Sequence, residues 1–302
     1  LEYHLLGNHL FANAKALAFA GCFFDGGEAD GWLKTGSRIL ESQVAEQILT
    51  DGAHFELSTM YHALALEDMF DLVNLWRAFP RVMENEGGLA EALLQNIAPM
   101  RGWLAAMCHP DGEISFFNDA AIGIAPSRGE LEAYANRLNL GPVQTPSGLL
   151  GPSGYARFES GPGVVILDAA RIGPDYLPGH AHADTLSFEL SLEGRRMLVN
   201  SGTSVYGAGP ERLRQRSTSA HNTVVVAGEN SSEVWSGFRV ARRAKPFGLS
   251  IVEDGETIRA TCAHDGYARL SGRPVHQRVV ELRPDGFEVA DIVTGARHSA
   301  EA

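Results

Sequence analysis

The stretch that decides the fold runs from Gly179 to Val226 and reads GHAHADTLSFELSLEGRRMLVNSGTSVYGAGPERLRQRSTSAHNTVVV. From Leu186 to Glu193 apolar and polar residues alternate, which predicts a β-strand with one buried face. The segment from Arg195 to Asn200 predicts the returning strand of a hairpin, with Gly194 in the turn. This stretch therefore predicts an antiparallel β-structure, and the rest of the chain is interpreted around it.

Three histidines flank these strands. His180 and His182 are two positions apart, and in an extended segment this spacing places both side chains on one side of the backbone. His221 precedes a further strand predicted over residues 222–226. The bland alternative is that each histidine is a hydrogen-bonded turn or surface residue. Their shared neighbourhood favours a site for metal and anion chemistry, together with nearby polar and cationic side chains: Asn200, Tyr206, Arg212 and Arg216.

The residues before this stretch predict a helical region and those after it a β-region. Helices are expected over 8–20, 37–49, 57–79, 89–108 and 130–138, with Ser58 or Thr59 as the N-cap of the third helix. Residues 141–154 are rich in Gly, Pro and Ser and predict a linker. Strands are expected over 155–159, 164–169, 186–200 (as a hairpin), 222–226, 247–252, 256–262, 275–283 and 286–293. The predicted organisation is a multidomain α+β chain, with helices in 1–140 and an antiparallel β-sandwich in 155–302.

Composition excludes several functional classes. The chain has 302 residues, of which 44% are hydrophobic and 21% charged, so it can bury a core without disulfides or metals. Its formal net charge of −12 argues against general nucleic-acid binding, although clustered arginines can still bind an anionic substrate or simply form a solvated basic face. The three cysteines form no CxxC pair or disulfide framework, and no apolar run is long enough to span a membrane. Because the chain begins at Leu1 without a methionine, we expect an excised, truncated piece of a longer protein.

Two segments of the helical region carry candidate functional residues. Asn8 and His9 lie at the start of a predicted helix, where an amide, an imidazole and the helix N-terminus can all interact with an anion; alternatively, Asn8 only caps the helix. The segment from Asp51 to Tyr61 is a polar loop that delivers His54, Glu56 and Tyr61 together at one end of the helical array. For Tyr61 the competing interpretation is a packing residue in the first helical turn.

Taken together, five motifs resemble the heparinase II/III-like polysaccharide lyases, including the related alginate and oligoalginate lyases: NHL from position 8, DGAHFELSTMYHALALED from 51, GHAHADTLSFEL from 179, LVNSGT from 198 and SAHNTVVV from 219. The resemblance covers nearly the whole chain. It implies an incomplete (α/α) toroid followed by an antiparallel β-sandwich, and cleavage of uronic-acid polysaccharides by β-elimination.

The resemblance also implies residue roles. Asn8 and His9 match the pair that neutralises the uronate carboxylate, Tyr61 the catalytic tyrosine and His180 the catalytic histidine. His182 and His221 match histidines that bind zinc, and Asn200 stands where the family has a zinc-binding aspartate, so we expect a weakened structural zinc site. His54, Glu56, Tyr206, Arg212 and Arg216 are the expected substrate-binding residues.

The predicted function is therefore lytic cleavage of an acidic polysaccharide, and the proton-transferring group is the Tyr61 hydroxyl, with His180 opposite it across a cleft between the two regions. Tyr61 needs cationic or donor neighbours to act as a base at neutral pH. A bacterial, periplasmic or secreted location is expected. The alternatives are a glycan-binding protein without catalysis on the same fold, and a metal-dependent hydrolase built on the three histidines. Neither the uronate, the linkage nor the oligomeric state can be predicted from the sequence.

Overall fold

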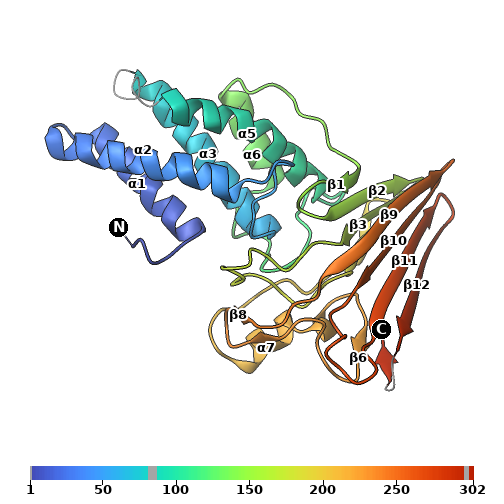
Figure 1. The fold of residues 1–302 in the computed structure, drawn as a ribbon. Coiled ribbons are helices and arrows are strands. Elements are labelled where there is room, and N and C mark those ends of the chain that lie inside the picture. Colours follow the sequence, from blue (N-terminus) through green and yellow to red (C-terminus); the bar gives the residue numbers. More distant parts are fainter. Residues whose placement is uncertain (1, 81–86, 296–298) are drawn as a thin grey trace.

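The computed structural model describes residues 2–80, 87–295 and 299–302. Helices occupy the first part of the chain and antiparallel sheets the second, and the two parts lie against each other (Figure 1). This arrangement confirms the predicted order of helices followed by antiparallel strands. The helices of the first part are α1 (Asn8–Phe23), α2 (Gly27–Gln47), α3 (Thr59–Ala78), α5 (Gly87–Ala106) and α6 (Arg128–Arg137).

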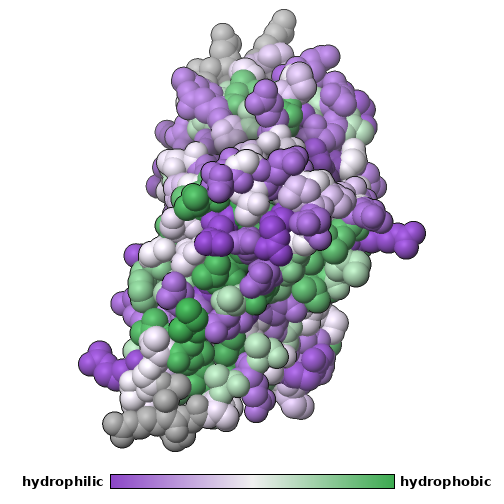
Figure 2. All heavy atoms as spheres, turned by 90° about the vertical axis from the view of Figure 1, so that its right-hand side faces the viewer, coloured by the Kyte–Doolittle hydropathy of each residue, from purple (hydrophilic) through white to green (hydrophobic). Residues whose placement is uncertain are grey.

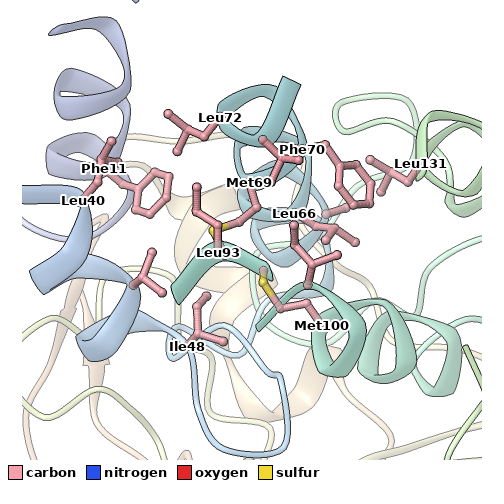
Figure 3. Close-up of a cluster of buried hydrophobic side chains, with 14 of the residues drawn as sticks. Phe11, Leu40, Ile48, Leu66, Met69, Phe70, Leu72, Leu93, Met100 and Leu131 are labelled. Atoms are coloured by element: carbon pink, nitrogen blue, oxygen red, sulfur yellow. The ribbon is translucent and has the colours of Figure 1, made fainter. Parts of the chain in front are cut away.

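These helices share one apolar core, to which each of them contributes side chains (Figure 3). On α3 the buried residues Leu66, Met69, Phe70 and Val73 recur every three or four positions, which is the spacing of one helix face. Complete burial of each such large apolar side chain contributes about 1.5–3 kcal/mol. The core therefore fixes α3, and with it the position of the first turn that carries Tyr61.

The segment before α3 is a tight turn that only glycine can make. Gly52 has φ of 92°, and a Cβ at this position would lie 2.2 Å from the backbone carbon of Pro99. Ser58 then caps α3, because its side chain accepts a hydrogen bond from the Tyr61 backbone N–H at 3.2 Å. The predicted N-cap is thereby confirmed as Ser58.

The second part contains two larger antiparallel sheets. The five-stranded sheet has the order β1 (Gly148–Leu150), β2 (Tyr155–Ser160), β3 (Gly163–Asp168), β4 (Phe188–Leu192) and β5 (Arg195–Leu198). The four-stranded sheet has the order β12 (Gly286–Thr294), β11 (Val275–Arg283), β10 (Thr257–His264) and β9 (Pro246–Asp254). Both sheets contribute to one apolar cluster that includes Phe158, Leu190, Ala260 and Val280. Smaller pairs join β6 (Val225–Val226) to β13 (Ala300–Glu301), and β7 (Val234–Trp235) to β8 (Arg239–Val240).

Two local predictions differ from the structure, and one short helix was not predicted. The predicted linker contains β1, which pairs with β2 at the edge of the larger sheet. Strand β4 is buried on both faces, because Glu189 on its polar side contacts His109 of the helical part at 2.6 Å. The arginine-rich segment forms a short helix, α7 (Pro210–Arg216), where Pro210 favours the first helical turn.

Figure 2 shows the side of the molecule formed largely by the four-stranded sheet, where apolar side chains gather between polar ones. Exposed apolar residues of this sheet include Phe247 and Val252 on β9 and Ile292 on β12. Within the described residues, no helix has both the length and the apolar character that a membrane crossing would need.

Candidate active site

A single buried carboxylate connects the predicted histidines. Asp119 lies 2.8 Å from Nδ1 of His180 through one oxygen and 2.8 Å from Nε2 of His182 through the other. The Arg212 guanidinium also donates to both oxygens of Asp119, through Nη1 to Oδ1 and through Nη2 to Oδ2, the latter at 2.7 Å. Burial alone would raise the pKa of Asp119, but the hydrogen bonds from these three side chains outweigh it and hold the pKa well below its usual range. We call these four residues the Asp119 cluster.

His180 and His182 therefore point to the same side of the chain, as their spacing predicts, although they lie in a loop before β4 and not on a strand. Because the ionised carboxylate of Asp119 can only accept, it fixes a proton on Nδ1 of His180 and on Nε2 of His182.

Tyr61 lies directly against His180. Their ring centroids are 3.9 Å apart with the planes inclined by 31°, and the Tyr61 hydroxyl is 3.1 Å from the hydroxyl of Tyr206. Burial, followed by the hydrogen bond with Tyr206, raises the pKa of Tyr61 well above its ordinary value. The phenol therefore keeps its proton at neutral pH. Tyr61 of the helical part and His180 of the β part thus meet between the two parts, as expected, but their rings are in contact and no cleft separates them.

The second ring nitrogen of His180 faces Glu56. His180 Nε2 is 3.3 Å from Oε2 of Glu56, a long distance for a hydrogen bond. Burial raises the pKa of Glu56, and the neighbouring His180 and the backbone N–H of Asn8 oppose this rise. Glu56 is only 2% exposed. This burial contradicts the prediction that Glu56 binds substrate, because its carboxyl group faces a protein side chain.

A pocket of about 180 Å³ lies beside Tyr61, between α1, α2 and α3. Asn8 and His54 are among the residues that line it, together with Gln47. Burial lowers the pKa of His54 to about 3, so its ring is neutral, and its Nε2 lies 3.0 Å from Oε1 of Gln47. His9 is exposed and is not part of this lining. The structure therefore brings Asn8 and His54 together with Tyr61, but does not bring His9 to this pocket.

The two predicted substrate-binding arginines are buried. Arg212 is 1% exposed and is held by Asp119, and Arg216 is 0% exposed and donates to the carbonyl oxygen of Ala181 at 2.8 Å and 3.0 Å. Direct substrate binding by Arg212 and Arg216 is thus contradicted, because their donors are used inside the protein. Tyr206, in contrast, is 48% exposed and remains a candidate for substrate contact.

Three buried side chains form a group that can hold a metal ion: His182, Asp184 and His221. Their ligand atoms lie within 4.8 Å of one another, and His182 Nδ1 is 3.2 Å from His221 Nε2. Two nitrogens bound to one tetrahedral zinc ion at ~2.0–2.1 Å lie ~3.3 Å apart. The other nitrogen of each ring donates to an oxygen, on Asp119 for His182 and on Asn200 for His221. The two facing nitrogens therefore both carry lone pairs, an arrangement that a cation between them would stabilise.

Asn200, the third predicted ligand, lies next to this group. Its Oδ1 is 3.2 Å from Nδ1 of His221, the ring nitrogen on the side away from His182. Asp184 adds a carboxylate that the sequence prediction did not include, and the contact with Asn200 fixes the tautomer of His221. Burial lowers the pKa of His182 and, to about 3, that of His221, so both rings are neutral, as metal binding requires.

Sequence reasoning missed Asp119 and its neighbour Asn118. Asn118 accepts a hydrogen bond from the His182 backbone N–H at 3.0 Å and donates to the Leu57 carbonyl at 2.9 Å, so it joins the two loops of the site. The only sequence signal was a polar Asn-Asp pair between apolar segments, which indicates a loop and no partner.

Comparison with known proteins supports a family assignment. The Heparinase II/III-like, C-terminal family matches residues 142–300, and the Heparinase II/III N-terminus family matches residues 1–137. Heparin-sulfate lyases from Bacteroides stercoris and Pedobacter heparinus are 27% and 26% identical over 258 and 260 residues. These alignments cover 78% and 76% of this chain but 38% and 37% of the relatives, so the chain spans less than half of their length.

Solved structures share the fold. A crystal structure of heparinase III matches with a TM-score of 0.75 at 24% identity, covering 96% of this chain and 47% of that chain. The heparan sulfate lyase HepC from Pedobacter heparinus matches with a TM-score of 0.71 at 22% identity, covering 96% of this chain and 46% of that chain. With both halves of the chain matched by its sequence families, the protein belongs to the heparinase II/III family.

Proposed function

We propose that this protein is a polysaccharide lyase that cleaves a uronic-acid polysaccharide by β-elimination. The observation that carries the proposal is the contact between the Tyr61 and His180 rings at 3.9 Å, beside a pocket lined by Asn8. The names of the relatives, heparin-sulfate lyases, favour heparin-like or heparan-like chains among the uronate polysaccharides.

In the proposed reaction the C5 proton of a uronate leaves, the bond from C4 to the bridging O4 breaks, and a C4–C5 double bond forms. The departing O4 takes up a proton. Charge that develops on the uronate carboxylate must be neutralised by nearby hydrogen-bond donors. One group must therefore accept a proton and another must supply one.

Tyr61 and His180 are the proposed pair. Tyr61 carries its proton at neutral pH and can transfer it to the strongly basic O4 as the bond from C4 to O4 breaks, so we assign it as the acid. His180 is the proposed base through Nε2, since its Nδ1 donates to Asp119 and the long contact from Nε2 to Glu56 can open when substrate binds. Asn8, at the first position of α1, is the proposed donor to the uronate carboxylate.

The metal group fits a structural role. We propose that zinc binds His182, Asp184 and His221. It would neutralise the charge of the Asp184 carboxylate and would be coordinated by the facing lone pairs of the two rings. Burial of all three side chains favours this role over a hydrolytic one, because a polysaccharide cannot reach them.

The helices are proposed to form part of an (α/α) toroid, and the two larger sheets a β-sandwich that shares the cluster around Leu190 and Val280.

The experiment is a panel of heparan sulfate, heparin, chondroitin sulfate and alginate, monitored by ultraviolet absorbance of the unsaturated product. We expect absorbance to rise with at least one substrate. Tyr61→Phe removes one oxygen and keeps the ring against His180, so the fold should survive while kcat falls by about 10²–10⁴. Asn8→Ala should also reduce cleavage, because it removes the proposed donor to the uronate carboxylate, but it leaves the acid, Tyr61, in place. Saturated products would show a hydrolase, and tight binding without any cleavage would show a binding protein.

A further inference from the structure

We propose that Phe238, together with Tyr206, forms an aromatic platform that stacks against a sugar ring next to the one that reacts. This inference rests on the proposed function and adds a residue that determines how the substrate is held. Phe238 is 44% exposed and Tyr206 is 48% exposed. Their rings are nearly parallel, inclined by 14°, with centroids 6.0 Å apart. We call these two rings the aromatic platform.

The platform is continuous with the reacting groups. The Tyr206 hydroxyl lies 3.1 Å from the Tyr61 hydroxyl, and the Phe238 ring centroid is 6.4 Å from that of His180. A sugar whose C4 and C5 lie at Tyr61 must therefore have a linked neighbour within reach of one of these exposed rings. This neighbouring sugar alone is enough to account for contact with the two exposed rings.

The platform is held in place from below by a buried cation. The Arg212 guanidinium lies 5.2 Å from the Tyr206 ring centroid and 5.5 Å from that of Phe238, and its Nε donates to the Gly237 carbonyl at 3.0 Å. Gly237 also packs so closely that a Cβ there would lie 2.6 Å from the Gly207 carbonyl oxygen. The Asp119 cluster thus fixes both His180 and the platform, so the rings are preorganised and lose little freedom on binding.

The chemistry of the platform suits an uncharged sugar face. Aromatic rings carry a negative face and a positive edge, and they bind apolar C–H surfaces by burial and dispersion. The chain as a whole carries a net charge of −12, which opposes a polyanionic substrate at long range. Stacking does not depend on charge, and so it can hold the polysaccharide where ionic attraction to the protein is weak.

The test compares Phe238→Leu, which removes the ring, with Phe238→Tyr, which keeps it. Trp235→Leu is the control, because Trp235 lies on the same hairpin and is 55% exposed, but within the described residues it makes no ring contact with His180 or Tyr206. The probe is a heparan sulfate hexasaccharide. Its Kd is measured by calorimetry in a Tyr61→Phe background to limit cleavage, at low and high salt, and kcat and KM are measured in the native background.

We expect Phe238→Leu to raise Kd and KM about tenfold, or about 1.4 kcal/mol, by the same factor at both salt concentrations and with little change in kcat or melting temperature. Phe238→Tyr and Trp235→Leu should bind like the parent protein. An unchanged Kd in Phe238→Leu would overturn the platform, as would no binding of the probe by the parent or an equal loss in Trp235→Leu. Binding that depends on Phe238 in a chain that cleaves nothing would support the platform while the proposed lyase activity fails.

Discussion

At the scale of the residue, Asp119 concentrates the electrostatics of the site in one carboxylate. It is 0% exposed, and it accepts hydrogen bonds from His180, His182 and Arg212. Each of these partners serves a different structure: the ring against Tyr61, the metal group and the aromatic platform. The loss of this one charge should therefore disturb all three.

We expect Asp119→Asn to remove most activity and to destabilise the fold, because a neutral amide cannot balance the buried Arg212 charge. Breaking a buried ion pair on one side typically costs about 3–5 kcal/mol. The measurements are kcat and the free energy of unfolding from denaturant titration. The control is Asp111→Asn, since Asp111 pairs with Arg196 at 2.7 Å near the surface and such pairs contribute less than about 1 kcal/mol. If both variants lost the same small amount, Asp119 would have no special role.

The residues of the site differ in how far sequence could predict them. Asn8, Tyr61 and His180 stand in motifs that carry their own local signals. Asp119 is 61, 63 and 93 positions from His180, His182 and Arg212, and no local pattern encodes contacts over such separations. The burial of Arg212 was unpredictable for the same reason, because an arginine run indicates charge but not the carboxylate that will cover it.

At the scale of the element, the N-terminus of α3 positions the catalytic candidate. Ser58 accepts from the Tyr61 backbone N–H at 3.2 Å, and its own hydroxyl donates to the Asp119 carbonyl at 2.5 Å. One side chain thus caps the helix and joins it to the loop of the Asp119 cluster.

Ser58→Ala should cost about 0.5–2 kcal/mol in stability and should also lower kcat, because the first turn of α3 loses its link to the Asp119 loop. Ser127→Ala is the matched control. Ser127 caps α6 in a capping box with Glu130, so its loss should have a comparable stability cost without affecting kcat. Thermal unfolding and initial rates of both variants decide the matter. Equal rates in the two variants would mean that α3 capping has no influence on the site.

The metal group ties the loop before β4 to the segment before β6. If zinc occupies it, removal by a chelator should lower the melting temperature by several degrees, since a ligand at a thousand times its Kd stabilises by about 4 kcal/mol. Added zinc should restore the original value. His221→Gln should abolish the response, whereas His264→Gln, a buried histidine outside the group, should preserve it. No bound metal and no shift on adding zinc would contradict the assignment.

Elements with strong periodicity were predicted well. Strand β11 spans Val275–Arg283, the range expected from sequence, because its residues alternate between buried and half-buried positions along the whole strand. Strand β6 is shorter than expected, with Val225–Val226 alone paired. Helix α7 was not expected, since seven residues are too few for a clear helical period. Strand β4 appeared to have a free polar face because the sequence does not show that the helical part covers it.

At the scale of the whole molecule, buried polar contacts join the helical and β parts. Arg157 of β2 donates to the Ala106 and Cys108 carbonyls at 2.9 Å and 2.7 Å, and His109 lies 2.6 Å from Glu189 and 2.7 Å from Ser191 of β4. In the folded protein these groups bond to each other across the two parts, and on unfolding they would bond to water instead. The two parts should therefore unfold together. Because buried histidines contribute to the structure, its stability should also depend on pH.

Acidification should destabilise the folded protein, starting as the pH falls below about 6.5. Burial lowers the pKa of His62 to about 4 and of His264 to about 3, and likewise lowers those of His54, His182 and His221. Between these values and the unfolded value of ~6.5, the unfolded chain binds protons that the folded chain does not, so stability falls by about 1.36 kcal/mol per pH unit for each histidine. Carboxyls with raised pKa values act in the opposite direction. Those buried as deeply as the histidines, Glu56, Asp168 and Asp184, are fewer than the histidines, and Glu67 and Asp68 are only half-buried.

The measurement is the melting temperature from pH 7.5 to pH 4.5, with the native protein compared with His62→Gln. The His62 ring accepts from the His54 backbone N–H at 3.1 Å and lies 2.9 Å from the Met100 carbonyl, so the folded state has no room for a second ring proton. His62→Gln should lower the stability at pH 7.5. It should also reduce the stability lost on acidification by up to about 1.36 kcal/mol per pH unit, the contribution of one histidine. An exposed control, His4→Gln, should follow the native curve. A melting temperature that stays constant or rises between pH 6.5 and pH 5 would contradict the prediction, since it would show that the folded chain binds at least as many protons as the unfolded one over this range.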